Sequence, residues 1–86
     1  MDAATLKELK ELTQLNLVGD AYQFAAESLG LTDLAAQFES INRRHLQAGE
    51  LTWELNHDRH AVYDKMMAHA KAHMSATDYQ KFYMLF

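Results

Sequence analysis

Residues 52–86 read TWELNHDRHAVYDKMMAHAKAHMSATDYQKFYMLF, and this stretch decides the fold class. Apolar side chains recur through its first two thirds at the spacing of one face of an α-helix. They are Leu55, Val62, Tyr63, Met66, Met67, Ala70 and Met74. Thr52 stands before this pattern, where its hydroxyl can cap a helix start. We therefore predict one long helix over about residues 52–74, spanning roughly 30 Å at 1.5 Å per residue.

A short final helix is predicted after the long one. Ser75 and Asp78 form a local helix-start signal, in which a small polar residue precedes the first turn. Four aromatic side chains then follow at positions i, i+3, i+4 and i+7, which lie on one side of a helix. These are Tyr79, Phe82, Tyr83 and Phe86.

The first half of the chain is divided by glycines, because it contains no proline. Each glycine follows a run with helical spacing, where a left-handed C-terminal cap favours Gly. The expected helix ends are Gly19, Gly30 and Gly49, and the expected capping residues at the starts are Thr5, Asp20 and Thr32. No strand-like alternation is present. We predict an all-α, compact bundle of four to five helices in one domain over residues 1–86, with residues 1–4 flexible.

Composition narrows the classes of function. The chain has 86 residues and no cysteine, so neither a disulfide framework nor a thiolate metal site is available. Twelve acidic and eight basic residues give a net charge of −4, which argues against a general binder of phosphate backbones. The N-terminus has no signal-peptide pattern, and no apolar run is long enough for a membrane span. We expect a soluble, cytoplasmic protein without membrane contact.

Enzymatic chemistry is not indicated. No serine lies in a Gly-x-Ser-x-Gly turn, and the three isolated glycines cannot form a phosphate-binding loop. We therefore expect no catalytic residue, no cofactor and no enzymatic activity.

The surplus of apolar residues near the C-terminus motivates the leading functional hypothesis. Aromatic residues and methionine are enriched at protein interfaces. Counting Met84 and Leu85, apolar groups surround most of the final helix, and one packing face cannot hide them all. The predicted interface residues are Tyr79, Phe82, Tyr83, Phe86, Met67 and Met74. We predict a non-catalytic protein–protein interaction module, a small regulator, adaptor or inhibitor that forms a homodimer. A purely structural role in the core is the competing interpretation.

A DNA-binding role is the first alternative. Residues 24–32 resemble the first half of a helix-turn-helix motif, with Gly30 in the turn, inside a degenerate unit over residues 20–48. Its candidate contacts to nucleic acid are Gln37, Arg43 and Arg44. The second half departs from the motif because Glu39 occupies an apolar position. Nucleic acid is therefore not the partner we expect.

A histidine-based metal site is the second alternative. His57 and His60 lie three residues apart, and His69 and His73 lie four apart, a spacing that can bind one metal ion on a helix. His60 and His69 are separated by about 13 Å along a helix, so the two pairs cannot share an ion. We predict polar flanking positions, with His73 partly buried, and no metal ligands.

Overall fold

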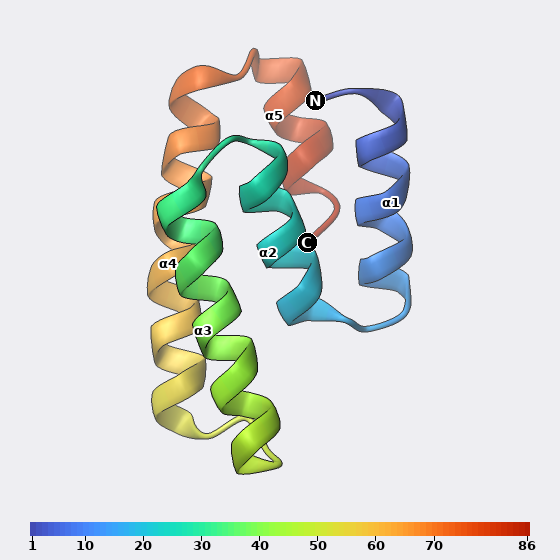
Figure 1. The fold of residues 1–86 in the computed structure, drawn as a ribbon. Helices are drawn as coiled ribbons and strands as arrows, with labels where there is room; N and C mark the ends of the chain where they lie inside the picture. Colours follow the sequence, from blue (N-terminus) through green and yellow to red (C-terminus); the bar gives the residue numbers. More distant parts are fainter.

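The computed structural model describes all 86 residues and confirms the all-α bundle. Its five helices are α1 (Ala3–Gln14), α2 (Val18–Ser28), α3 (Thr32–Ala48), α4 (Trp53–His73) and α5 (Ala76–Tyr83). The helices α3 and α4 form a long antiparallel pair, α2 packs against them, and α1 lies on the outer side of α2 (Figure 1). The short α5 follows the end of α4 and returns along the bundle.

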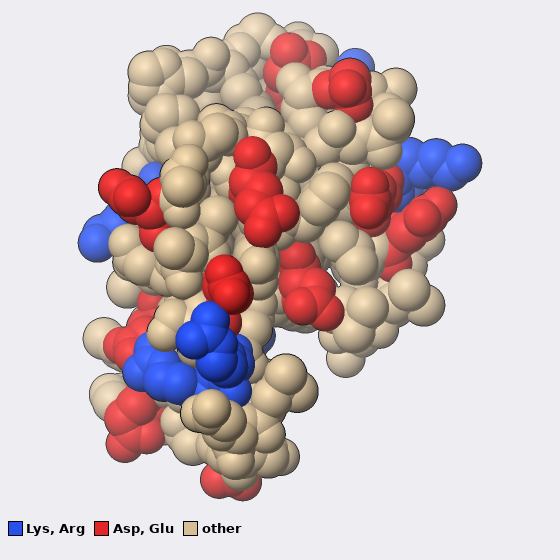
Figure 2. Space-filling view, viewed as in Figure 1, with Lys and Arg blue, Asp and Glu red and all other residues tan.

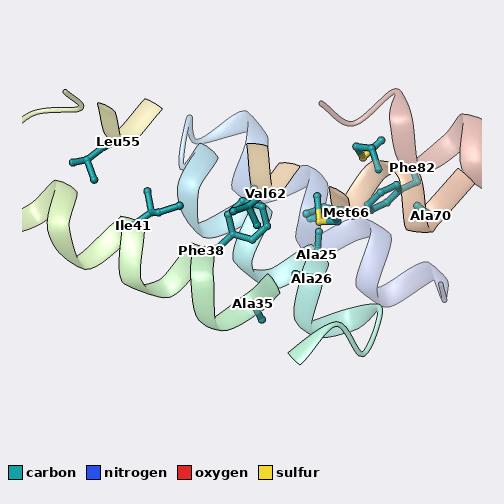
Figure 3. Packing of buried hydrophobic residues seen from close by; sticks show 13 residues of the cluster. Ala25, Ala26, Ala35, Phe38, Ile41, Leu55, Val62, Met66, Ala70 and Phe82 are labelled. Atoms are coloured by element: carbon teal, nitrogen blue, oxygen red, sulfur yellow. The ribbon is translucent and has the colours of Figure 1, made fainter. Parts of the chain in front are cut away.

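The core is a single cluster of thirteen buried apolar residues contributed by all five helices. Phe38, Phe82, Leu9 and Met66 are its largest fully buried side chains. Figure 3 shows the cluster running from Leu55 and Ile41 between α3 and α4 to Phe82 on α5. No polar side chain is buried, so the fold rests on apolar packing and on the helix hydrogen bonds.

Two of the three predicted glycine stops are confirmed. Gly30 follows α2 and Gly49 follows α3, with φ of 74° and 75° in the left-handed region. At Gly30 the backbone N–H donates to the carbonyl of Glu27, and the N–H of Leu31 donates to that of Ala26. This pair of bonds is a Schellman motif, which satisfies carbonyls that the helix end would otherwise leave free.

The predicted stop at Gly19 is wrong. α1 ends at Gln14, and Asn16 takes the left-handed conformation with φ 60°. The N–H of Leu17 donates to the carbonyl of Leu12, and that of Asn16 to the carbonyl of Thr13, which is again a Schellman motif. Asparagine tolerates this conformation better than most residues. Gly19 instead lies in the first turn of α2.

Some of the predicted helix starts are also confirmed and others are wrong. Thr52 and Ser75 are confirmed as N-caps, since their hydroxyls accept from the N–H groups three residues later, at 3.2 and 3.1 Å. The other three predicted starts lie too late in the sequence, Thr5 and Asp20 by two or three residues and Thr32 by one. Asp2 caps α1 instead of Thr5, so α1 includes Ala3 and Ala4 of the segment expected to be flexible. The helix α2 begins before Asp20, and Thr32 is the first residue of α3, not its cap.

Gly19 has a packing role that its local sequence does not show. The Asn42 side chain of α3 lies against it and donates to the Gly19 carbonyl and to the Gln23 side chain, both at 3.1 Å. A Cβ at position 19 would collide with this carboxamide. The absence of a side chain therefore lets α2 approach α3 closely at this point.

The α3–α4 pair extends beyond α2 at one end of the molecule. The helix α2 has 11 residues, whereas α3 has 17 and α4 has 21. Figure 1 shows the end of α3 and the start of α4 projecting past the first turn of α2. We call this projection, residues 43–60, the arm. None of the five helices has the length and apolar character needed to cross a membrane.

Candidate protein interface on α4 and α5

The predicted interface residues do not all lie at the surface. Phe82 is fully buried and Met67 is 7% exposed, and both belong to the core. Both side chains are packed in the core, so neither can reach a partner without unfolding. A substitution at Phe82 therefore reports on stability and not on an exposed surface.

Four apolar residues remain accessible between the end of α4 and the end of α5. Tyr83 is 52% exposed and Met84 is 70% exposed, while Met74 and Tyr79 are half-buried. The Tyr79 and Tyr83 rings lie edge to face with centroids 6.0 Å apart. We call Met74, Tyr79, Tyr83 and Met84 the α5 surface.

A hollow of about 490 Å³ adjoins the α5 surface. It is lined by Lys71, Met74, Ala76, Tyr79, Gln80 and Tyr83. Apolar walls with a few polar groups at the edge are typical of a place where a partner inserts a side chain. The volume is in the range of small binding pockets, although the hollow is formed by only two short stretches of chain.

The α5 surface is positioned by local signals at the end of α4. Met74 is extended, with φ −93° and ψ 157°, which ends α4 and turns the chain. Ser75 then caps α5 through the N–H of Asp78. With this start fixed, Tyr79 and Tyr83 follow one helical turn apart on the same side, beside the buried Phe82.

Phe86 belongs to an internal aromatic cluster more than to the α5 surface. Its ring lies 5.2 Å from that of Phe82, 5.4 Å from Tyr22 and 5.9 Å from Tyr63, measured between centroids. Burial raises the pKa of both Tyr22 and Tyr63. The Arg59 guanidinium, 5.7 Å from the Tyr22 ring, opposes part of that rise in the pKa of Tyr22. The chain end is thereby packed onto α2 and α4, with Phe86 still 37% exposed.

The candidate DNA contacts on α3 lie among acidic side chains. Arg43 forms an ion pair with Glu39 at 2.9 Å, and Arg44 pairs with Asp58 at 3.6 Å. Gln37 is exposed. Figure 2 shows one compact group of basic side chains in the lower part of the molecule, with acidic side chains on several sides of it. Such pairing reduces the charge available to phosphates.

The apolar positions that a helix-turn-helix needs on α3 are also not occupied as in that motif. They fall on Ala36 and Glu39, and both residues are exposed. The core of α3 is formed instead by Ala35, Phe38 and Ile41.

The histidines remain in separate pairs. His69 and His73 stack with ring centroids 4.2 Å apart, and His57 and His60 each lie 3.9 Å from an aspartate. No group of three or more potential ligands comes together in a geometry that could hold a metal ion. The predicted partial burial of His73 is wrong, because His73 is exposed and His69 is half-buried.

Sequence reasoning missed a second group of exposed apolar residues, at the other end of the molecule. Leu46 is 82% exposed, Trp53 is 74% exposed and Leu17 is 42% exposed. Trp53 stacks on His57 of the same helix, at 5.3 Å between ring centroids. No local sequence pattern indicates this group, because Leu46 is exposed where α3 extends beyond the first turn of α2.

Comparison with known proteins identifies no relative of this chain. No protein-family description, curated protein or solved structure matches the chain.

Proposed function

We propose that this chain is a non-catalytic protein–protein interaction module that associates through the α5 surface. The observation that carries the proposal is the exposure of Tyr83, which lines a hollow with apolar walls, and of the next residue, Met84. In the cell such a module would act as a small cytoplasmic regulator, adaptor or inhibitor.

The residue types of the α5 surface support binding. Tyrosine supplies a large contact area at a low entropic cost, and its hydroxyl tolerates water when free. Methionine adapts its shape to a partner. Lys71 and Gln80 at the hollow supply the polar rim that interfaces need. Charged side chains do not cover Tyr83 and Met84, so apolar area is left in contact with water.

A second copy of the chain is the partner we propose first. In a two-fold dimer, the same surface meets itself, so a projecting side chain of each copy can enter the hollow of the other. One surface carries both a hollow, lined in part by Tyr83, and exposed side chains at Tyr83 and Met84, and this combination supports a dimer of that kind.

Sedimentation equilibrium tests the proposal over low micromolar to millimolar concentrations. We expect the wild type to approach twice the monomer mass, and the double variant Tyr83→Asp/Met84→Asp to remain a monomer with unchanged circular dichroism. Leu46→Asp is the matched control, because Leu46 is an apolar residue on the arm that is even more exposed than Tyr83 and Met84 and lies outside the α5 surface. Dimerisation that survives the double variant, or is abolished by the control, would show that the α5 surface is not the site. A wild type that stays monomeric over this concentration range would contradict the proposed self-association.

A further inference from the structure

His69 and His73 lie side by side near the end of α4, close to where the chain turns into α5 (Figure 1). Their imidazole rings stack with centroids 4.2 Å apart and 29° between the ring planes. His73 is exposed and His69 is half-buried. The two rings therefore contact one another, and the pair can be reached from solvent.

Neither ring has another polar partner within the chain. None of the ion pairs or side-chain hydrogen bonds of the structure involves His69 or His73. His57 and His60 differ in this respect, because a ring nitrogen of each lies 3.9 Å from an aspartate oxygen. The ring nitrogens of the His69–His73 pair are thus available as ligands.

The spacing of the two rings suits chelation of a metal ion. A bond between zinc and an imidazole nitrogen is about 2.0–2.1 Å long, so two nitrogens on one tetrahedral ion are about 3–3.5 Å apart. Side chains four residues apart project from the same side of a helix. Because the centroids are already 4.2 Å apart, rotation of the two side chains about their own bonds can bring one nitrogen of each ring to this separation. The backbone of α4 does not have to change.

We infer that His69 and His73 together chelate one divalent ion of the late first transition series, with Cu²⁺ bound most tightly. Imidazole suits copper, nickel and zinc, whereas Mg²⁺ and Ca²⁺ require oxygen ligands. For a fixed set of ligands, the affinity order places Cu²⁺ above Ni²⁺ and Zn²⁺. The spacing of the histidines alone predicts no metal ligands. The contact between two rings without other partners is the structural observation that favours a site.

The protein supplies two ligands and leaves the other positions of the ion open. No group of three or more histidine and acidic side chains in the chain could hold an ion. Water therefore completes the coordination, in contrast to a closed structural zinc site with four protein ligands.

The bound ion links two successive turns at the end of α4. This helix ends at His73, and the extended Met74 begins the turn that leads into α5. A bridge between His69 and His73 opposes fraying of the last turn. Because the ion binds the folded chain, it also raises the melting temperature as its concentration rises above the Kd. Neither histidine belongs to the α5 surface, so the site does not depend on self-association.

Isothermal titration calorimetry of the untagged protein with CuCl₂, NiCl₂ and ZnCl₂ measures this binding. We expect one ion per chain, Cu²⁺ as the tightest ligand, and no heat of binding with MgCl₂. The matched variant is Lys71→His/His73→Lys, which keeps the composition and the net charge. It separates the two rings, because residues two apart do not face each other on a helix. Both positions are exposed, so circular dichroism should show an unchanged fold.

The exchange of residues 71 and 73 should weaken binding of each ion about tenfold or more, because the two ligands no longer act on one ion together. His57→Gln/His60→Gln should bind as tightly as the wild type. A wild type without saturable binding, or equal affinities of the wild type and the exchange variant, would overturn the inference. So would loss of binding in His57→Gln/His60→Gln.

Nuclear magnetic resonance of the imidazole groups then locates the ion, with diamagnetic Zn²⁺ as the probe. We expect the ring signals of His69 and His73 to shift together and to saturate at one ion per chain. Shifts confined to the rings of His45, His57 or His60 would place the ion elsewhere and contradict the proposed pair.

Discussion

Gly19→Ala is a sensitive test of the packing between α2 and α3. Alanine is more favourable than glycine by about 1 kcal/mol in a helix interior, which is an upper bound for Gly19 in the first turn of α2. Here the new Cβ would collide with the Asn42 carboxamide, whose Cγ lies 3.1 Å from the Cβ position. The Asn42 side chain would have to rotate away and lose its two hydrogen bonds, to the Gly19 carbonyl and to Gln23.

The two effects have opposite signs, and the structure sets their relative size. Each lost hydrogen bond costs about 1 kcal/mol, so the rotation costs about 2 kcal/mol in total. Subtracting a gain in helix propensity of at most about 1 kcal/mol leaves a net destabilisation of at least about 1 kcal/mol. For a domain of this size, that loss corresponds to a fall in melting temperature of about 4–8 °C.

Urea denaturation followed by circular dichroism measures this change, together with a matched double variant. Asn42→Ala removes the carboxamide, so in that background Gly19→Ala should stabilise the chain by up to about 1 kcal/mol. The sign of the Gly19→Ala effect should thus reverse when Asn42 is absent. If Gly19→Ala stabilises the otherwise unchanged protein, the close approach of α2 to α3 is wrong.

Three further predictions concern the aromatic residues and the end of α1. Phe82→Ala should cost about 3–5 kcal/mol in urea denaturation and Tyr83→Ala less than about 0.5 kcal/mol, because only Phe82 is buried; equal losses would contradict the burial of Phe82 and the exposure of Tyr83. Asn16→Ala should cost about 1 kcal/mol and Asn16→Gly should be tolerated, since the φ of 60° is strained for alanine; a neutral Asn16→Ala would rule out this conformation. Burial raises the pKa of Tyr22 and Tyr63, so the unfolded chain ionises first and stability should fall as pH rises above 10.0; a fall of the same size in Tyr22→Phe/Tyr63→Phe would assign it to other groups.

Much of the fold could be predicted from local signals. Where a polar cap and an apolar repeat coincide, as at Thr52 and Ser75, the helix start was correct. Gly30 and Gly49 end helices as predicted, because glycine adopts the left-handed conformation of a helix end without steric cost. The predicted helix end at Gly19 is wrong because glycine can also permit close packing between helices. The residue whose side chain packs against it, Asn42, lies 23 residues away in the sequence. That requirement is tertiary and leaves no local pattern.

The candidate site could be located only in part. Helical spacing placed Tyr79, Phe82 and Tyr83 on one side of a helix, but spacing does not tell which of them faces the core. That distinction depends on how far α5 tilts into the bundle, and the structure buries Phe82 while leaving Tyr83 exposed. The exposure of Leu46 on the arm could not be predicted at all, because it results from a difference in length between α2 and α3.

Nuclear magnetic resonance on a dilution series tests the central proposal most directly. Amide chemical shifts of the ¹⁵N-labelled wild type are compared from low micromolar to millimolar concentration. The proposal predicts concentration-dependent shifts centred on residues 71–84, around Tyr83 and Met84, that disappear in Tyr83→Asp/Met84→Asp. A spectrum that does not change with concentration, or shifts confined to the arm, would contradict association through the α5 surface.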